Sequence, residues 1–306
     1  MRSAWRKPAS VLLRCVGRAL QLALNVTRRA LSYLANQVNF INVRFVEFVP
    51  RPSDVFIVTY PRSGTTWMQM ILYQLTTGGS DDFTHIAEVC PWFERAAARG
   101  DNLERLPPVR IIKSHLPYSR IPKGPCRYIY VTRSGEDVAA SYWRLYRSHL
   151  GYKGDFDAFF ERFLKGRVQY GSWFEHVAGW LEQAGRRNVL HLRYEDLLRD
   201  LDGCIARIAD FCGIDVDPAR LPMVREKCSL AYMKRHEDKF DHATELLWEK
   251  GLLRRAFIGR GRAGEAAGML SAEQRRRFER NLDSHLAGFG FPGARSEARA
   301  MRDGGP

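Results

Sequence analysis

One stretch of the sequence, residues 54–75 (DVFIVTYPRSGTTWMQMILYQL), constrains the fold more than any other. Its apolar run, residues 55–58, has the length and β-branched character of a buried strand. A turn of small residues follows, and apolar residues then recur at helical spacing from Trp67 to Leu75. A strand, a small-residue turn and a helix together aim backbone N–H groups and a helix dipole at an anion. The stretch therefore predicts a site for phosphate or sulfate.

The turn also carries side chains that suit an anion. Arg62 supplies a fixed positive charge, and Ser63, Thr65 and Thr66 supply hydroxyl donors. A nucleoside-triphosphate loop would have a glycine five residues before Gly64 and a lysine directly after it, whereas this sequence has threonine at both positions. This argues against a loop that holds a β/γ-phosphate pair with Mg²⁺. In the alternative interpretation, the hydroxyls only cap the helix.

The positive charge of the chain is concentrated at its two ends. Of the net charge of +14, residues 1–50 carry +7, residues 51–250 carry +2 and residues 251–306 carry +5. A nucleic-acid-binding protein would carry a basic face on its folded body, so we expect no nucleic-acid partner. The six scattered cysteines form neither a C-x-x-C pair nor a zinc pattern, which favours a reduced, cytoplasmic compartment.

We divide the chain into a basic amphipathic segment (1–50), a folded domain (51–290) and a basic tail (291–306). In the first segment, four arginines interrupt the apolar residues, and no uninterrupted run reaches the ~20 residues that span a bilayer. Two interpretations stay open. The segment forms a helix that lies on an anionic membrane surface and makes the protein peripheral there, or it packs on the domain.

Three further apolar runs have the character of short buried strands: residues 109–115, 127–132 and 189–194. Helical patterns alternate with them, which predicts a single α/β domain with a central, mainly parallel sheet flanked by helices. In such a sheet, ligands bind beyond the carboxyl ends of the strands. Lys113 and His115 end the second strand and Arg133 ends the third, so we expect them at the same edge as Arg62. The alternatives are a structural histidine and a surface ion pair.

The long, loosely patterned region 77–108 contains an aromatic pair, and more aromatic residues follow the second and third strands. Loops of this length in a compact domain usually carry function. We expect these aromatic residues to form a substrate pocket suited to a hydrophobic alcohol or phenol. Its predicted members are Trp92, Phe93, Tyr118, Tyr142, Trp143 and Tyr146.

A series of motifs spread over residues 50–290 resembles the cytosolic-type sulfotransferases, which use 3′-phosphoadenosine-5′-phosphosulfate (PAPS) as donor. TYPRSGTTW is similar to the family's P-loop-like phosphosulfate loop, RIIKSHLP to its strand with the catalytic histidine, and RSGEDVAASY to its 3′-phosphate motif. YGSWFEHVAGW, YEDL and the Arg260–Gly261 loop follow in the family's order and spacing.

The resemblance implies a role for individual residues. The phosphosulfate would be held by Arg62, Ser63, Gly64, Thr65 and Thr66. Trp67 and Tyr194 would contact the adenine, while the 3′-phosphate would be held by Arg133, Ser141, Arg260 and Gly261. The catalytic residues would be His115 as base, Lys113 on the transferred group and Arg62 as electrostatic clamp.

Three departures from the family pattern matter. Arg62 stands where the family usually has lysine, and Gly259 stands where it has a basic residue that contacts the 3′-phosphate. The family's dimerisation segment, KNxFTVxxxE, has no counterpart in GEAAGMLSAEQ, which leaves the oligomeric state open.

The sequence thus predicts an enzyme that transfers a sulfuryl group from PAPS to the hydroxyl of a small molecule. The transfer would be an in-line displacement without metal, with His115 as general base. Two other classes stay open: a Mg²⁺-dependent nucleotide kinase of P-loop fold, and a non-enzymatic protein that binds a membrane surface.

Overall fold

The computed structural model describes residues 15–20, 22–23, 40–44, 46–149, 151–240, 258 and 261–289. Arg260, the tail 291–306 and most of the segment 1–50 lie outside these described residues. At the centre is a four-stranded sheet in the order β2-β1-β3-β4, and each neighbouring pair is parallel. The strands are β1 (Val55–Thr59), β2 (Ile111–Ser114), β3 (Arg127–Thr132) and β4 (Val189–Arg193). The predicted α/β class with a central parallel sheet is confirmed.

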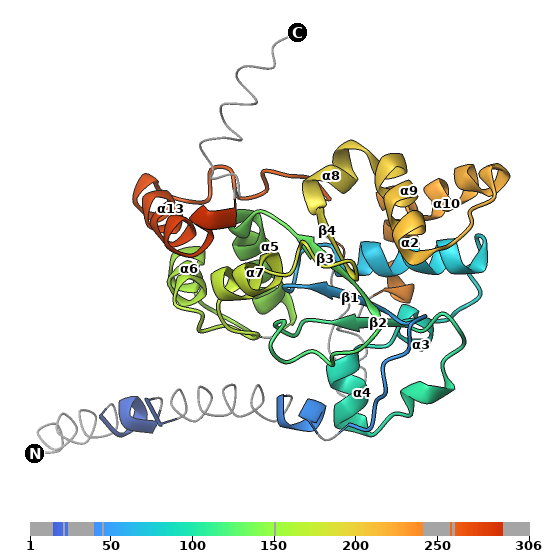
Figure 1. Ribbon diagram of the computed structural model, residues 1–306. Coiled ribbons are helices and arrows are strands. Elements are labelled where there is room, and N and C mark those ends of the chain that lie inside the picture. The colour runs from blue at the N-terminus through green and yellow to red at the C-terminus, as the bar shows by residue number, and fades with distance from the viewer. Residues whose placement is uncertain are drawn as a thin grey trace, which may run out of the picture.

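Helices flank the sheet, with α2, α9 and α10 on one side and α4 on the other (Figure 1). Their bounds are α2 (Thr65–Thr77), α3 (Ile86–Val89), α4 (Phe93–Arg99), α5 (Gly135–His149), α6 (Phe156–Leu164), α7 (Trp173–Leu181), α8 (Tyr194–Arg199), α9 (Leu201–Cys212), α10 (Leu221–Lys227), α11 (Leu230–Arg235) and α13 (Ala272–Leu286). Short 3₁₀ turns are η1 (Leu103–Arg105), η2 (Pro218–Arg220), η3 (Glu237–Lys239) and η5 (Ala287–Phe289).

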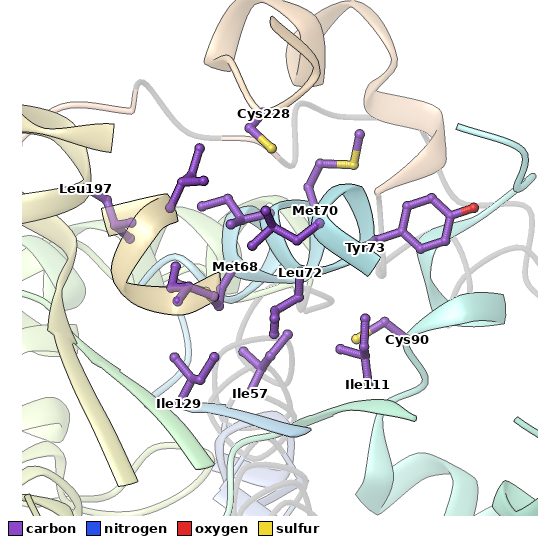
Figure 2. Close-up of a cluster of buried hydrophobic side chains, with 14 of the residues drawn as sticks. Ile57, Met68, Met70, Leu72, Tyr73, Cys90, Ile111, Ile129, Leu197 and Cys228 are labelled. Carbon is purple, nitrogen blue, oxygen red and sulfur yellow. The ribbon is translucent and has the colours of Figure 1, made fainter. Parts of the chain in front are cut away.

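The central strand β1 is buried on both faces, because successive side chains of a strand point in opposite directions. Val55 and Ile57 pack in the core that α2 and α9 cover. Figure 2 shows side chains of α2 over Ile57 and Ile129 of the sheet. Phe56 and Val58 pack in a second core on the opposite face. Burial on both faces explains why this stretch is an uninterrupted apolar run.

A third core joins α5, α6, α7 and α13, which gather beside one edge of the sheet (Figure 1). Helix α13 begins with a capping box. The Ser271 hydroxyl accepts from the backbone N–H of Gln274, and the Gln274 side chain accepts from the N–H of Ser271. Phe278 of this helix packs against Trp173 and Phe174 of α7.

All six cysteines are free thiols, as predicted, and only Cys15 is exposed. Burial raises the pKa of Cys90, Cys212 and Cys228 to about 12, so these thiols stay protonated at neutral pH and are poor nucleophiles. Among the described residues, no helix has both the length and the apolar character that crossing a membrane requires.

Candidate active site

The loop between β1 and α2 forms a backbone cradle at the carboxyl edge of the sheet. Arg62 and Gly64 have positive φ angles of 73° and 95°. A β-carbon on Gly64 would lie 2.7 Å from the Tyr194 ring, so only glycine fits here. Gly64 is also the N-cap of α2, and the helix therefore lacks a side-chain cap.

The hydroxyls of the loop are not used as helix caps. Thr65 Oγ1 lies 2.6 Å from Thr59 Oγ1. Ser63 Oγ is buried and has no hydrogen-bond partner within the described part of the chain. An unsatisfied buried hydroxyl beside an uncapped helix N-terminus fits a loop built to receive an anion.

Arg62 is partly buried beside this cradle and remains a cation. Its Nε donates to Ser141 Oγ of α5 at 3.0 Å. Burial, and secondly the charge of Arg133, lower the pKa of Arg62 to about 10, so the guanidinium is still protonated at neutral pH. The partly buried Arg62 and the buried Arg133 repel each other, and the electrostatics of such a site favour a bound anion.

Arg133, directly after β3, is tied to two acidic groups, one of them from a distant part of the chain. Its Nη2 donates to Glu265 Oε1 at 3.2 Å and lies 3.7 Å from Asp137 Oδ2. The Asp137 carboxylate in turn accepts from the backbone N–H groups of Gly264 and Ala266, at 2.8 and 2.9 Å. These bonds hold the 261–266 loop against the start of α5.

The residues that the sequence assigns to adenine lie next to Arg133. The guanidinium carbon of Arg133 lies 4.5 Å from the Tyr194 ring centroid, and Trp67 meets the same ring edge-on at 5.6 Å. Arg133 Nε is buried without a hydrogen-bond partner among the described residues. Gly261 has a φ of 67°, and a β-carbon there would lie 2.4 Å from Leu230. Arg62, Ser141, Arg133 and Tyr194 are thus brought together, whereas the structure does not describe Arg260.

His115 follows β2 and is buried, with one ring nitrogen committed. Its Nδ1 lies 2.9 Å from the carbonyl oxygen of Thr59. A carbonyl oxygen only accepts, so Nδ1 carries the proton and Nε2 carries the lone pair in the neutral ring. Lys113 lies two residues earlier, and its Nζ is 4.4 Å from the centroid of the Trp92 ring.

Three buried groups that the sequence did not indicate surround His115. Glu94 Oε1 accepts from the His115 backbone N–H at 2.8 Å. His176 Nε2 lies 3.2 Å from the His115 carbonyl oxygen, and burial lowers the His176 pKa to about 4. The Tyr170 ring packs edge-on against His115, with centroids 5.2 Å apart. Of these three groups, His176 alone has a signal in the sequence, because it is a histidine within the apolar stripe of residues 173–181.

The structure places the six predicted pocket residues in or against two hydrophobic clusters. One includes Trp92, Tyr142, Trp143 and Tyr146, and the other includes Phe93 and Tyr118. Phe93 is fully buried in a core with Phe48 and Phe56. Tyr142 is also a core residue, buried against Tyr60 and Tyr146.

The other predicted pocket residues have different immediate neighbours. Trp92 packs against His115, with ring centroids 5.2 Å apart. Tyr118 packs on Trp180 at 5.2 Å, and Trp143 lines a cavity beside α5. Tyr146 is buried, and its hydroxyl accepts from the backbone N–H of Gln169.

The known proteins that this chain resembles belong to one family. A model of the sulfotransferase domain matches residues 52–290. Human sulfotransferase 4A1 is 40% identical over 190 residues, which are 59% of this chain and 67% of that protein. Sulfotransferase 1B1 of Mus musculus is 30% identical over 260 residues, 80% of this chain and 86% of that protein.

Solved structures of similar fold include a retinol dehydratase in complex with retinol and PAP. It is 25% identical, with a TM-score of 0.68, and the match covers 81% of this chain and 86% of that one. Mouse sulfotransferase SULT7A1, complexed with PAP, is 26% identical with a TM-score of 0.61, and the match covers 84% and 89% of the two chains.

Proposed function

Because the chain belongs to the cytosolic-type sulfotransferase family and is a PAPS-dependent sulfotransferase, we propose that it sulfonates a hydrophobic alcohol or phenol with His115 as general base. The observation that carries this proposal is the bond from His115 Nδ1 to the Thr59 carbonyl oxygen. It puts the proton of the neutral ring on Nδ1, so the lone pair that takes the acceptor's proton is that of Nε2. The anion loop begins directly after Thr59, so the residue that holds the base also precedes the loop.

We assign the donor to the cradle at this edge. PAPS, when bound, supplies an activated sulfuryl group. Its 5′-phosphosulfate would lie on the N–H groups and hydroxyls of Ser63, Gly64, Thr65 and Thr66. The buried Ser63 Oγ and the charge of Arg62 support this placement. Its adenine would lie at Trp67 and Tyr194, and its 3′-phosphate at Arg133, Ser141, Gly261 and the undescribed Arg260.

Arg62 and Lys113 differ in what each can do for the transferred group. Arg62 stays protonated at neutral pH, so it stabilises the negative charge that develops on the leaving oxygen without giving up a proton. Lys113 is buried in β2 beside Trp92, and a lysine, unlike an arginine, can give up its proton. In this assignment Arg62 acts as clamp, and Lys113 steadies the equatorial oxygens.

We propose that the transfer needs no metal. A sulfuryl group carries less negative charge than a phosphoryl group, so cationic side chains and N–H donors suffice to balance it. Within the described residues, no group of three or more His, Cys, Asp and Glu is arranged to hold a metal ion. A nucleotide kinase would instead require Mg²⁺ and ATP, and this difference separates the two classes experimentally.

For the acceptor, we propose a small hydrophobic molecule whose hydroxyl reaches His115 past Trp92 and Tyr170. Both rings lie against His115, and apolar walls with one positioned polar group are typical of small-molecule sites. Similar solved structures contain retinol or androsterone, which are hydrophobic alcohols.

We also propose that the protein is cytoplasmic and that residues 1–50 hold it at anionic membrane surfaces. These residues carry +7 of the net charge, and each basic residue near such a surface contributes roughly 1 kcal/mol. Deletion of residues 1–45 should abolish sedimentation with phosphatidylserine vesicles at low salt and leave activity on a water-soluble phenol intact. A full-length protein that does not sediment would contradict membrane binding.

The experiment that tests the function is a screen of phenols and hydrophobic alcohols with ³⁵S-labelled PAPS, in EDTA and in Mg²⁺. We expect label on an acceptor at equal rates in both, and no turnover of ATP. Mg²⁺-dependent ATP turnover without sulfuryl transfer would favour the kinase alternative. Binding of PAP without transfer to any acceptor would favour a non-enzymatic role.

A further inference from the structure

A second concave site lies beside the later half of α5, outside the proposed active site. It is a cavity of about 490 Å³, within the usual range for small-molecule sites. It is lined by Trp143, Arg144, Arg147, Ser148, Tyr152 and Lys153. None of these residues is among those that surround His115, and Trp143 contributes to this cavity rather than to the acceptor site.

The lining is strongly cationic. Three of the six lining side chains are basic, and among the described residues no ion pair holds Arg147 or Lys153. The acids nearby are already engaged. Glu265 pairs with Arg144, and Asp155 accepts from the backbone N–H of Ala158 as the N-cap of α6. The cavity therefore attracts an anion.

Two aromatic rings give the cavity apolar walls in fixed positions. Trp143 Nε1 donates to the Gly154 carbonyl oxygen at 3.3 Å, and Arg147 lies over the Trp143 ring at 5.0 Å. Tyr152 packs edge-on against Phe159, with centroids 5.8 Å apart. Rings held by neighbours offer contact area at little cost in conformational entropy.

We propose that this cavity binds an aromatic anion: a ring that packs on Trp143 and Tyr152 and bears one sulfonate, sulfate or carboxylate that pairs with Arg147 and Lys153. Arginine and lysine beside aromatic faces recognise such a ligand through charge-assisted hydrogen bonds and ring contacts. The site requires no chemistry at His115, so it goes beyond the proposed function.

The same cavity is linked to the donor site through one buried carboxylate. Glu265 binds Arg144, which lines the cavity, with one oxygen, and binds Arg133 with the other. An anion held by Arg147 and Lys153 also attracts the neighbouring Arg144, which lines the same cavity, away from Glu265. Glu265 then pairs more fully with Arg133. Arg133 becomes less available to a 3′-phosphate. The cavity ligand and PAP therefore weaken each other's binding, equally in both directions.

Binding is tested on the full-length protein with 1-anilinonaphthalene-8-sulfonate as fluorescent probe. We expect at least a tenfold higher Kd in the double variant Arg147→Gln/Lys153→Gln than in the wild type. The charge-matched control is Arg207→Gln/Arg275→Gln, which removes two exposed cations from α9 and α13 and should leave the Kd unchanged. An equal Kd in the cavity variant and the wild type would overturn the site, and so would an equal loss in the control.

Coupling is tested by calorimetric titration of PAP with and without saturating probe. The PAP Kd should rise on the order of fivefold or more with the probe in the wild type and stay constant in the cavity variant. An unchanged PAP Kd in the wild type would overturn the link through Glu265. Titration of PAP into the wild type alone reports separately on the proposed donor site.

Discussion

The two cationic ends of the proposed donor site are built in different ways. At His115, a backbone group of the adjacent strand holds the ring, because Nδ1 binds the Thr59 carbonyl oxygen. Arg133 donates to the carbonyl oxygens of Arg62 and Arg262, and it also pairs with two buried carboxylates. One of these carboxylates, Glu265, is 132 residues away in the chain. The first region is pre-organised by the sheet, whereas the second is held by buried charges that a ligand can replace.

This difference suggests a division of labour. A base needs a fixed position and a fixed tautomer, and a strand-end backbone bond provides both. An arginine that binds a phosphate needs a partner that the phosphate can displace. A buried carboxylate is such a partner, although it competes with the ligand for the arginine. The variants below test whether the two regions are separable.

The largest effect is expected from His115→Ala. Loss of a positioned base should lower kcat on the order of 10²–10⁴-fold. PAP binding should stay near wild type, because His115 makes none of the proposed nucleotide contacts. His285→Ala, at an exposed histidine of α13, is the control and should have no effect. Near-normal turnover of His115→Ala would remove this residue from the mechanism.

The second effect concerns Glu265→Gln. Arg133 would lose the closer of its two carboxylate partners and keep Asp137 at 3.7 Å. The free energy of unfolding of the ligand-free protein should therefore fall, by no more than the roughly 3–5 kcal/mol of a fully broken buried pair. The Kd for PAP should fall, because the 3′-phosphate no longer competes. Urea denaturation and calorimetry measure the two quantities, with the exposed Glu273→Gln as control. Weaker PAP binding in Glu265→Gln would mean that Glu265 orients Arg133 for the phosphate.

The third effect is one of donor choice. Arg133→Ala should weaken PAPS on the order of 10²-fold more than adenosine-5′-phosphosulfate, because its charge-assisted bonds serve only the 3′-phosphate. The ratio of the two KM values measures this. Arg199→Ala, at an exposed ion pair of α8, is the control. Equal weakening of both donors would make Arg133 a structural residue.

The smallest effect is the pH dependence that His176 gives to the first region. Its folded pKa of about 4 lies below the ordinary value of 6.5, so the unfolded chain takes up the proton first as pH falls. Stability is complete above pH 6.5 and is lost toward pH 4, by about 2 kcal/mol at pH 5. Urea midpoints of His176→Gln should fall less steeply over this range. Parallel slopes would contradict the assignment. Burial also lowers the pKa of His191 to about 4, and this histidine is present in both proteins.

How much of the structure could be predicted from the sequence differs between the same two regions. The strands, the loop and the strand-end positions of Lys113, His115 and Arg133 follow from local patterns, and the structure places them at one edge. The partners of Arg133 and His115 could not be predicted. Glu265 and Glu94 reach them only through tertiary packing, and no local pattern marks a carboxylate as buried.

The directions of the predicted pocket residues could not be read from the sequence for a related reason. Aromatic residues are conspicuous in a sequence, but their direction depends on the element that carries them. Trp92 lies just before α4 and reaches His115, whereas Phe93, its first residue, turns into the core. Tyr170, which does reach His115, has a positive φ of 71° in a short loop that no periodicity describes.

Single-turnover sulfuryl transfer at saturating PAPS, measured in Arg133→Ala and His115→Ala alongside PAP affinity, tests the division of labour most directly. Arg133→Ala should bind PAP weakly and, once saturated, transfer at a rate near that of the wild type. His115→Ala should bind PAP normally and transfer on the order of 10²–10⁴-fold more slowly. A slow rate in saturated Arg133→Ala, or weak PAP binding in His115→Ala, would show that the two regions do not act separately and would contradict the account.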